Sequence, residues 1–213
     1  EILTVETFKY GMSNDIYLSG YNQYRQEILN NESPFYSFKP DITILAVAID
    51  ELIDNFSEIF LNISNNDLDR RLQEIIDLFS NLIKSIRSQI QSKIIINNFN
   101  YPFLLKPEIY DFQNINGQTE WIKRLNSALV NLVAQFEDVY IFDINHYTSY
   151  FGAKSSYDTR MWFVAKIPYK IDFISFIAKK YSQYIKSTFE KRKCLVLDLD
   201  NTICTTNKSN YKS

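Results

Sequence analysis

The chain has 213 residues, of which 23 are basic and 25 acidic, and the resulting net charge of −2 gives no electrostatic reason to expect nucleic-acid binding. Apolar residues make up 46% of the sequence, which is enough for a substantial core and excludes bulk disorder. With 1 histidine and 2 cysteines, the chain cannot build a zinc site from several histidines or a disulfide framework.

The first forty or so residues predict short elements. Residues 1–12 have the loose apolar spacing of a helix that ends at Gly11, residues 15–18 predict a short strand, and residues 21–31 predict a polar helical segment. The chain begins without Met and stops shortly after a strand-like run, so we expect both ends to be cut from a longer protein. No signal peptide and no membrane-spanning stretch are visible, and we expect a cytoplasmic location.

From residue 41 onward, short apolar runs alternate with amphipathic stretches. Runs without period-2 alternation are typical of strands buried on both faces of a parallel sheet, and they occur at residues 41–49, 93–97, 139–142 and 193–199. Apolar residues at helical spacing predict helices at residues 67–91, 119–135 and 172–190, with a shorter helix at 51–61. The segments predicted to be loops rich in aromatic side chains are residues 98–118 and 144–170. Strands that alternate with helices indicate an α/β fold in which a parallel sheet lies between two helical layers.

In such a fold the ligand site lies at the carboxyl ends of the strands. The ends of the predicted strands carry Asp50, Asn97, Asn98, Asp143 and Asp198. Aromatic clusters at residues 17–24, 101–112 and 147–163 could line a groove for a sugar or a carrier, although packing in the core and loops is the simpler explanation.

Residues 194–202 read Cys-Leu-Val-Leu-Asp-Leu-Asp-Asn-Thr, in which a buried strand delivers the pattern Asp-x-Asp-x-Thr. This pattern resembles the first motif of phosphatases of the haloacid dehalogenase (HAD) superfamily. In that chemistry Asp198 attacks phosphorus as a nucleophile, and Asp200 protonates the leaving oxygen and then activates water. Mg²⁺ is the expected cofactor, with Asp198 and Asp200 among its ligands.

The motif is present, but a whole HAD domain is not. The phosphate-holding and distal acidic motifs of that domain are not found after Asp198. We therefore expect residues 1–190 to form one domain and residues 191–213 to contain only the first strand and motif of a second. By itself this chain is expected to be inactive, whereas the protein that it comes from is expected to be a Mg²⁺-dependent phosphatase or transferase.

A second resemblance covers nearly the whole chain. The block at 21–30, which reads YNQYRQEILN, and the segments at 97–99, 124–126, 158–162 and 166–168 resemble the amino-terminal region of FkbH-like proteins. Members of that family join an SGNH-hydrolase-like domain to a HAD domain. The resemblance therefore implies a three-layer α/β/α parallel sheet, SGNH/flavodoxin-like, that here lacks its first strand.

The same resemblance implies partners. Some family members transfer a glyceryl unit from a phosphorylated donor to a carrier-protein thiol, and others accompany polyketide, nonribosomal peptide or surface-polysaccharide pathways. The expected partners are the HAD domain of the same protein and either an acyl carrier protein or a sugar-phosphate precursor. After Thr202 this sequence continues with Ile203 and Cys204, where the family usually has Leu-Trp, and it is there more similar to HAD phosphatases of capsule biosynthesis.

SGNH hydrolases use a Ser after the first strand, Gly and Asn as oxyanion donors, and a late Asp-x-x-His. That Ser would precede this chain, Gly20 could supply an oxyanion N–H, and Asp50 stands where an Asn donor is expected. Asp158-Thr-Arg-Met161 stands where Asp-x-x-His is expected, and the single histidine, His146, lies earlier. Because no base is placed beside a nucleophile, we favour a scaffold used for binding or domain organisation.

The candidate substrate-binding residues on this scaffold are Gly20, Asn22, Arg25, Asp50, Asn97, Asp158 and Arg160. Of the basic residues, Arg25, Arg160 and Lys166 could hold a phosphate or a pantetheine arm. Three functions stay open: the partner domain of a HAD phosphatase or acyl transferase, a non-catalytic binding module for a carrier protein or glycan precursor, and an SGNH esterase whose nucleophile lies upstream.

Overall fold

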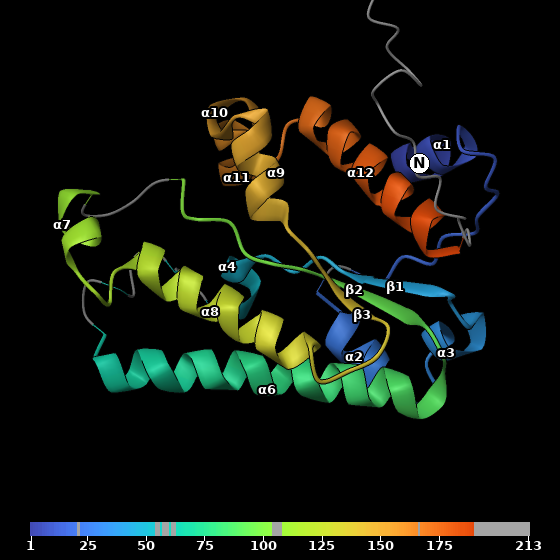
Figure 1. The fold of residues 1–213 in the computed structure, drawn as a ribbon, viewed down its shortest axis with the longest axis horizontal. Coiled ribbons are helices and arrows are strands. Elements are labelled where there is room, and N and C mark those ends of the chain that lie inside the picture. The colour runs from blue at the N-terminus through green and yellow to red at the C-terminus, as the bar shows by residue number, and fades with distance from the viewer. Residues whose placement is uncertain are drawn as a thin grey trace, which may run out of the picture. The chain divides into compact units, whose positions relative to one another are not determined.

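A parallel sheet forms the centre of the larger part of the computed structural model (Figure 1). The structure describes residues 1–20, 22–53, 56, 60, 63–103, 108–165 and 167–189. These residues divide into two compact units, one made of residues 1–14 and 178–189 and the other of residues 15–177. The sheet belongs to the second unit.

The strands of the described chain are β1 (Ile42–Leu45), β2 (Lys93–Asn97) and β3 (Val139–Phe142). They pair in parallel in the order β1-β2-β3, with Ile42 opposite Lys93 and Ile94 opposite Val139. Each strand lies within an apolar run that predicts it, and the expected α/β fold with a parallel sheet is confirmed. The fourth predicted strand, at residues 193–199, lies outside the described residues.

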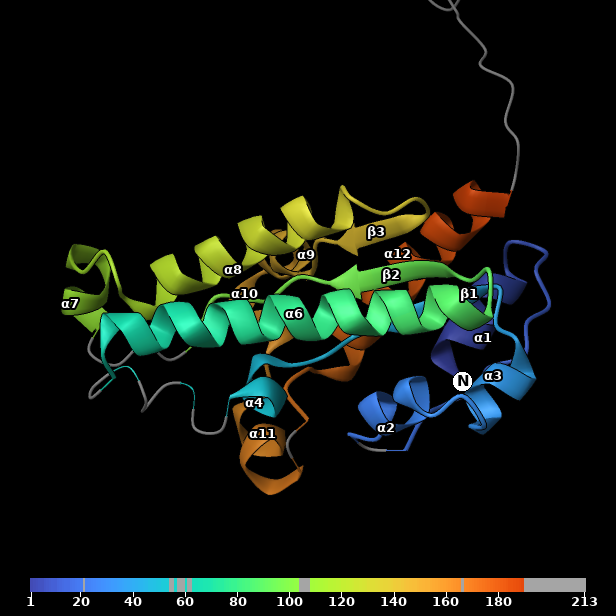
Figure 2. The same ribbon diagram turned by 90° about the horizontal axis from the view of Figure 1, so that it is seen from below.

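Two long amphipathic helices cover one face of this sheet (Figures 1 and 2). They are α6 (Asn65–Gln89), between β1 and β2, and α8 (Gln118–Val133), between β2 and β3. Because crossovers between parallel strands are right-handed, strands added successively in one direction place both helices on the same face. α6 begins after Ser64, whose side chain accepts a hydrogen bond from the Asp67 backbone N–H at 3.2 Å.

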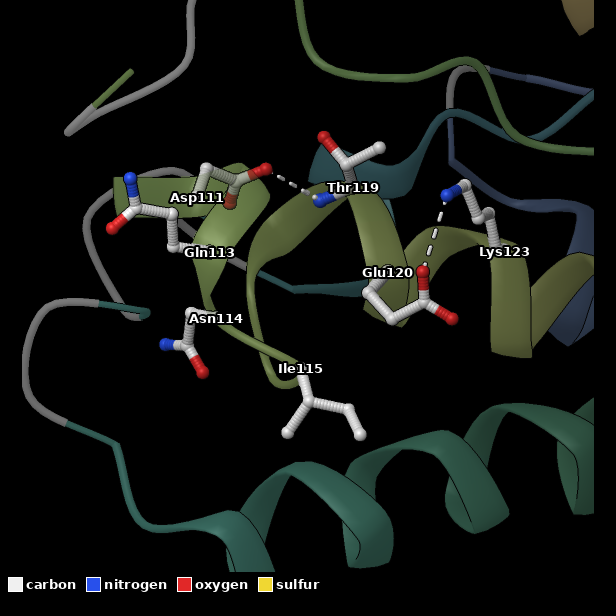
Figure 3. Close-up of a pocket in the computed structure, with 7 residues that line it drawn as sticks. All are labelled: Asp111, Gln113, Asn114, Ile115, Thr119, Glu120 and Lys123. Atoms are coloured by element: carbon white, nitrogen blue, oxygen red, sulfur yellow. Dashed lines mark hydrogen bonds and ion pairs between the residues drawn. The ribbon is translucent and has the colours of Figure 1, made fainter. Parts of the chain in front are cut away.

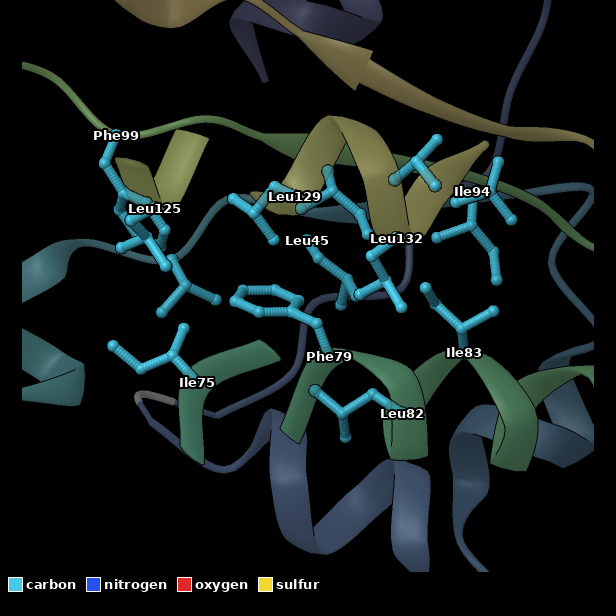
Figure 4. Close-up of a cluster of buried hydrophobic side chains, with 14 of the residues drawn as sticks. Leu45, Ile75, Phe79, Leu82, Ile83, Ile94, Phe99, Leu125, Leu129 and Leu132 are labelled. Carbon is cyan, nitrogen blue, oxygen red and sulfur yellow. The ribbon is translucent and has the colours of Figure 1, made fainter. Parts of the chain in front are cut away.

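The core lies between these two helices and the sheet (Figure 4). It is built from aliphatic and aromatic side chains of the helical stripes and of the central strand, among them Phe79, Leu82, Ile83, Leu125, Leu129, Ile94 and Ile96. Trp121 is also fully buried, and its indole N–H donates to the Leu68 carbonyl at 3.0 Å. The polar atom of this large side chain is therefore satisfied inside the core.

Several short helices replace the loops that the sequence predicts. They are α7 (Glu108–Gln113), α9 (Ile144–Phe151), α10 (Ala153–Ser156) and α11 (Thr159–Ala165). The loop prediction was wrong here because these helices are too short to show an amphipathic stripe. Aspartates at the starts of α9 and α11 supply a local signal: Asp143 accepts from the His146 backbone N–H at 2.9 Å, and Asp158 accepts from the Met161 backbone N–H at 2.9 Å.

The remaining elements are α1 (Ile2–Phe8), α2 (Tyr24–Leu29), α3 (Pro34–Phe38), α4 (Ile49–Leu52) and α12 (Ile171–Phe189). Residues 15–18 form no strand, contrary to the prediction. Ile16 and Leu18 are exposed there, and the Tyr17 hydroxyl donates to Glu27 Oε2 at 2.9 Å. The Tyr17 ring packs against the rings of Phe35 and Phe38, so side-chain contacts fix this segment instead of strand pairing.

Hydrogen bonds and an ion pair stabilise the amino edge of the sheet, where β2 and β3 begin. Near the end of α6, the Arg87 guanidinium donates to the backbone carbonyls of Ser92, Glu137 and Asp138. Lys93 Nζ lies 2.8 Å from the Asp138 carboxylate, and this hydrogen bond raises the pKa of Lys93 and lowers that of Asp138. The starts of β2 and β3 are thereby held against the end of α6.

In the smaller unit, Tyr10 connects the segment after α1 to the end of α12. The Gln183 side-chain amide donates to the Tyr10 hydroxyl at 3.1 Å, and Lys186 Nζ lies 5.3 Å from the centroid of the Tyr10 ring. Among the helices that the structure describes, none is long and apolar enough to cross a membrane.

Candidate functional site

The carboxyl edge of the sheet brings together polar side chains from the segments that follow the three described strands. After β1 the chain enters α4, whose first turn carries Asp50 and Glu51. β2 ends at Asn97, and Asn98 and Asp143 directly follow β2 and β3. Because parallel strands end at one edge, these groups gather where a fold of this class places its ligand.

Asn98 and Asp143 hold two of these segments to each other. Asn98 Nδ2 donates to Asp143 Oδ1 at 2.7 Å, and Asn98 Oδ1 accepts from the Asn145 backbone N–H at 3.2 Å. Asp143 also accepts the hydrogen bond that begins α9. Both side chains are therefore engaged in fixing the loops beside the site.

A second group contains an amide and two phenols from the segments after β2 and β3. Asn100 Nδ2 donates to the Tyr169 hydroxyl at 2.8 Å, and Tyr157 and Tyr169 form an antiparallel backbone bridge. The Phe103 ring stacks on the Tyr157 ring, with centroids 4.2 Å apart. Within the described part of the chain, Asn100 Oδ1 is buried without a hydrogen-bond partner. A buried polar atom left in this way is unusual, and it provides an acceptor at this edge.

Burial raises the pKa of both phenols, Tyr157 and Tyr169. Desolvation raises the pKa of Tyr157 to about 12, and the charge of Asp50 acts in the same direction. Desolvation also raises the pKa of Tyr169 to about 12, against a smaller opposing effect of the hydrogen bond from Asn100. Both hydroxyls are therefore neutral at physiological pH.

A third group lies at the start of α2. Arg25 Nε donates to the Tyr24 hydroxyl at 2.9 Å, and the guanidinium carbon lies 5.6 Å from the centroid of the Tyr24 ring. Burial raises the pKa of Glu51, while the charge of Arg25 partly offsets that shift. The two acidic residues of α4 thus differ in their electrostatic partners: Glu51 is affected by the charge of Arg25, and Asp50 affects Tyr157.

The other candidates from the sequence lie at more exposed positions. Gly20 is exposed, and its carbonyl accepts from the Gln23 backbone N–H at 3.0 Å. Asn22 is exposed and has a left-handed φ of 54°. Arg160 is exposed on α11, and Asp158 provides the hydrogen bond that begins that helix. The roles expected for these residues in binding stay predictions.

The single histidine is exposed, and its ring contacts the rings of Tyr147 and Tyr150, with centroids 5.5 and 6.4 Å away. Within the described residues, no hydroxyl or thiol is hydrogen-bonded to the His146 ring. Lys166, Asp198 and Asp200 lie outside the described residues. Over the ranges that are described, no group of three or more His, Cys, Asp and Glu side chains could hold a metal ion.

Sequence reasoning missed part of this edge. The sequence gives one clue to Asn100, because it follows closely after Asn97 and Asn98 at the end of β2. Tyr24 and Tyr157 are visible in the sequence only as members of aromatic clusters. Tyr169 has no signal of its own, because its place depends on the bridge to Tyr157.

A pocket of about 270 Å³ lies between α7 and the start of α8 (Figure 3). Its lining residues are Asp111, Gln113, Asn114, Ile115, Thr119, Glu120 and Lys123. The Asp111 carboxylate accepts from the backbone N–H groups of Gln118 and Thr119, and Lys123 pairs with Glu120 at 3.1 Å. The charges of this pocket are thus used within the protein, and the carboxyl edge is the stronger candidate.

Comparisons with known proteins agree with this architecture. The family described as FkbH, N-terminal domain, matches residues 3–186. A crystal structure of the N-terminal part of the protein BF1531 from Bacteroides fragilis, described as containing a phosphatase domain complexed with Mg, is similar with a TM-score of 0.75 and 20% sequence identity. The alignment covers 95% of this chain and 52% of that one, so the chain spans about half the length of that structure. At this identity the likeness shows the fold. No curated protein matches the chain.

Proposed function

This chain belongs to the family of FkbH N-terminal domains, and from that premise we propose that it holds the substrate for a Mg²⁺-dependent phosphatase domain that begins near residue 191. The observation that carries the proposal is the carboxyl edge of the sheet. It gathers hydrogen-bonding and charged groups from the segments after all three described strands. Within the described residues, no nucleophile is hydrogen-bonded to the histidine ring.

The catalytic part of the proposal rests on residues 198–202. Asp198 would attack phosphorus to form an aspartyl-phosphate, and Asp200 would protonate the leaving oxygen and later take a proton from the attacking water. Two carboxylates are hard oxygen donors that suit Mg²⁺, which would offset the charge of the phosphoryl group when bound. The description of the BF1531 structure, which includes a phosphatase domain with Mg, supports this pairing of domains.

The segment after Thr202 favours phosphatase chemistry over glyceryl transfer. It has Ile203 and Cys204 where FkbH-like proteins usually have Leu-Trp. We further propose that the held substrate is either a sugar-phosphate precursor or a group borne by an acyl carrier protein, since both carry phosphate or hydroxyl oxygens that suit the donors at the carboxyl edge.

The test is hydrolysis of p-nitrophenyl phosphate by the complete gene product, with Mg²⁺ and with EDTA. We expect Asp198→Asn to lower the Mg²⁺-dependent rate by about 10³-fold or more, because the amide cannot form the covalent intermediate. Asp77→Asn, an exposed position on α6, is the matched control and should retain the wild-type rate. A fully active Asp198→Asn protein would contradict the proposal.

A further inference from the structure

Arg25 is a half-buried cation whose hydrogen bond in the described residues goes to a neutral partner. We propose that Arg25 and Tyr24 form the receptor for the phosphoryl group of the ligand, a phosphate monoester of a hydroxylated compound. This inference rests on the proposed function and names the chemical class of its substrate.

The orientation of Arg25 is fixed on one side. Its Nε is committed to the Tyr24 hydroxyl at 2.9 Å, and the guanidinium lies over the Tyr24 ring. The two terminal Nη groups remain to donate together, which is the fork that binds two oxygens of one phosphate. No carboxylate of the described residues lies within ion-pairing distance of this guanidinium.

Tyr24 adds a second donor. Its hydroxyl oxygen accepts from Arg25, so its own proton points elsewhere, and the described residues offer it no acceptor. The phenol keeps that proton at neutral pH, as an ordinary tyrosine does, and burial raises the pKa of Tyr24 further. A neutral hydroxyl beside a cationic fork is a suitable arrangement for an anion, because the charge and the donors act on the same oxygens.

The acidic residues of α4 interact electrostatically with this receptor and with Tyr157. Glu51 faces Arg25 closely enough to be affected by its charge, and the preceding Asp50 affects Tyr157. The same edge carries the hydroxyl of Tyr169, the side chain of Tyr157 and the buried oxygen of Asn100. Carboxylate, hydroxyl and amide oxygens recognise the hydroxyl groups of a polyol or sugar, and for that reason we choose a hydroxylated phosphate monoester.

Three other arginines, Arg87, Arg70 and Arg124, are engaged differently. Arg87 donates to backbone carbonyls, Arg70 pairs with Asp67, and Arg124 pairs with Asp69. Arg70 is exposed on α6 and provides a matched control, because replacing it removes one positive charge on a helix remote in sequence from α2.

The experiment is a titration of inorganic phosphate into ¹⁵N-labelled protein, with EDTA present so that Mg²⁺-dependent binding does not contribute. We expect a saturable shift of the Arg25 side-chain N–H resonance in the wild type. Arg25→Gln should weaken binding about tenfold or more, Tyr24→Phe should weaken it less, and Arg25→Lys should restore part of the affinity. Arg70→Gln should bind as the wild type does.

Equal phosphate affinity in the wild type and Arg25→Gln, or no saturable binding, would overturn the inference, and so would acetate binding as tightly as phosphate. The amide spectrum of each variant reports whether it is folded, so a lost fold is distinguished from a lost contact. The readout does not depend on hydrolysis. An active Asp198→Asn protein with Arg25-dependent phosphate binding would refute the proposed function alone.

Discussion

The Tyr169 hydroxyl is the residue-scale feature with the clearest consequence for stability. It is desolvated although part of the side chain reaches solvent, and its pKa is raised to about 12. The folded chain therefore retains a proton that the unfolded chain loses near pH 10. Stability is unaffected below pH 10, falls as pH rises from 10 to 12, and levels off above that range.

We expect the free energy of unfolding to fall by about 1.4 kcal/mol more between pH 8 and pH 11 in the wild type than in Tyr169→Phe, because phenylalanine has no proton to lose. Urea unfolding at both pH values measures the difference. Because each variant is compared with itself at the two pH values, the stability lost with the hydrogen bond to Asn100 cancels. Tyr150→Phe, at an exposed position, should show the wild-type loss. The same loss in Tyr169→Phe as in the wild type would count against the role of this hydroxyl.

For single residues, the sequence predicts where the polar side chains of the carboxyl edge lie better than it predicts what they do. Asp50, Asn97 and Asp143 follow predicted strands, and a parallel sheet must bring them to one edge. The structure then uses Asp143 and Asp158 to begin short helices, a purpose that the sequence pattern does not distinguish from binding. Asn100 and Tyr169 meet only through the folded path of two loops, so no local pattern reveals the pair.

At the scale of elements, the start of α8 depends on a side chain from α7. Asp111 accepts from the backbone N–H groups of Gln118 and Thr119, which the helix itself cannot satisfy. A Cβ at Gly117 would lie 2.4 Å from the Asp111 carbonyl oxygen, so glycine permits this close approach. The turn between α7 and α8 is therefore fixed by backbone contacts as well as by the carboxylate.

We expect Asp111→Ala to lower the free energy of unfolding by about 1–2 kcal/mol, since it leaves buried N–H groups without an acceptor. Urea unfolding followed by fluorescence is a suitable measurement because Trp121 lies one turn along the same helix. Asp77→Ala, exposed on α6, is expected to change stability by less than about 0.5 kcal/mol. If both variants were equally stable, Asp111 would not be holding the helix start.

Long elements follow from the sequence, and short ones do not. α6, α8 and α12 have stripes that predict them within a few residues, and the strands are continuous apolar runs. α9, α10 and α11 are each only a few turns or less, too short for a repeated stripe to identify them, and side-chain caps mark the starts of α9 and α11. Periodicity therefore predicts the scaffold and leaves the segments beside the site unpredicted.

At the scale of the whole molecule, one cluster of apolar side chains joins the helical layer to the sheet in residues 15–177. Phe79 is fully buried in it, and its ring lies 6.3 Å from that of Phe99, which follows β2. Asn126 on α8 fixes the same position, because its amide donates to the Phe99 carbonyl and accepts from the Phe99 N–H. The core and the carboxyl edge are therefore parts of one packed unit.

Phe79→Ala is expected to lower the free energy of unfolding by about 3–5 kcal/mol, because it removes a large ring from a close-packed interior. Phe79→Leu should lose less, and it serves as the readout if the alanine variant does not fold. Val130→Ala, at an exposed position on α8, is the control and should cost less than about 0.5 kcal/mol. Urea unfolding of the three variants measures these differences. If Phe79→Leu lowered the free energy of unfolding as little as Val130→Ala does, close packing around Phe79 would be contradicted.

The parallel order of the strands also constrains how the chain reaches its fold. Ile42 pairs with Lys93 and Ile94 with Val139, so each pairing must close a loop that contains a whole helix. Loop closure of this kind costs chain entropy before any strand contact repays it, and folds dominated by distant pairings form slowly. Helices α6 and α8 can form from local contacts first, and the Arg87 bonds to Glu137 and Asp138 can form only once β3 has reached the sheet. We therefore expect the Arg87 bonds to form late in folding.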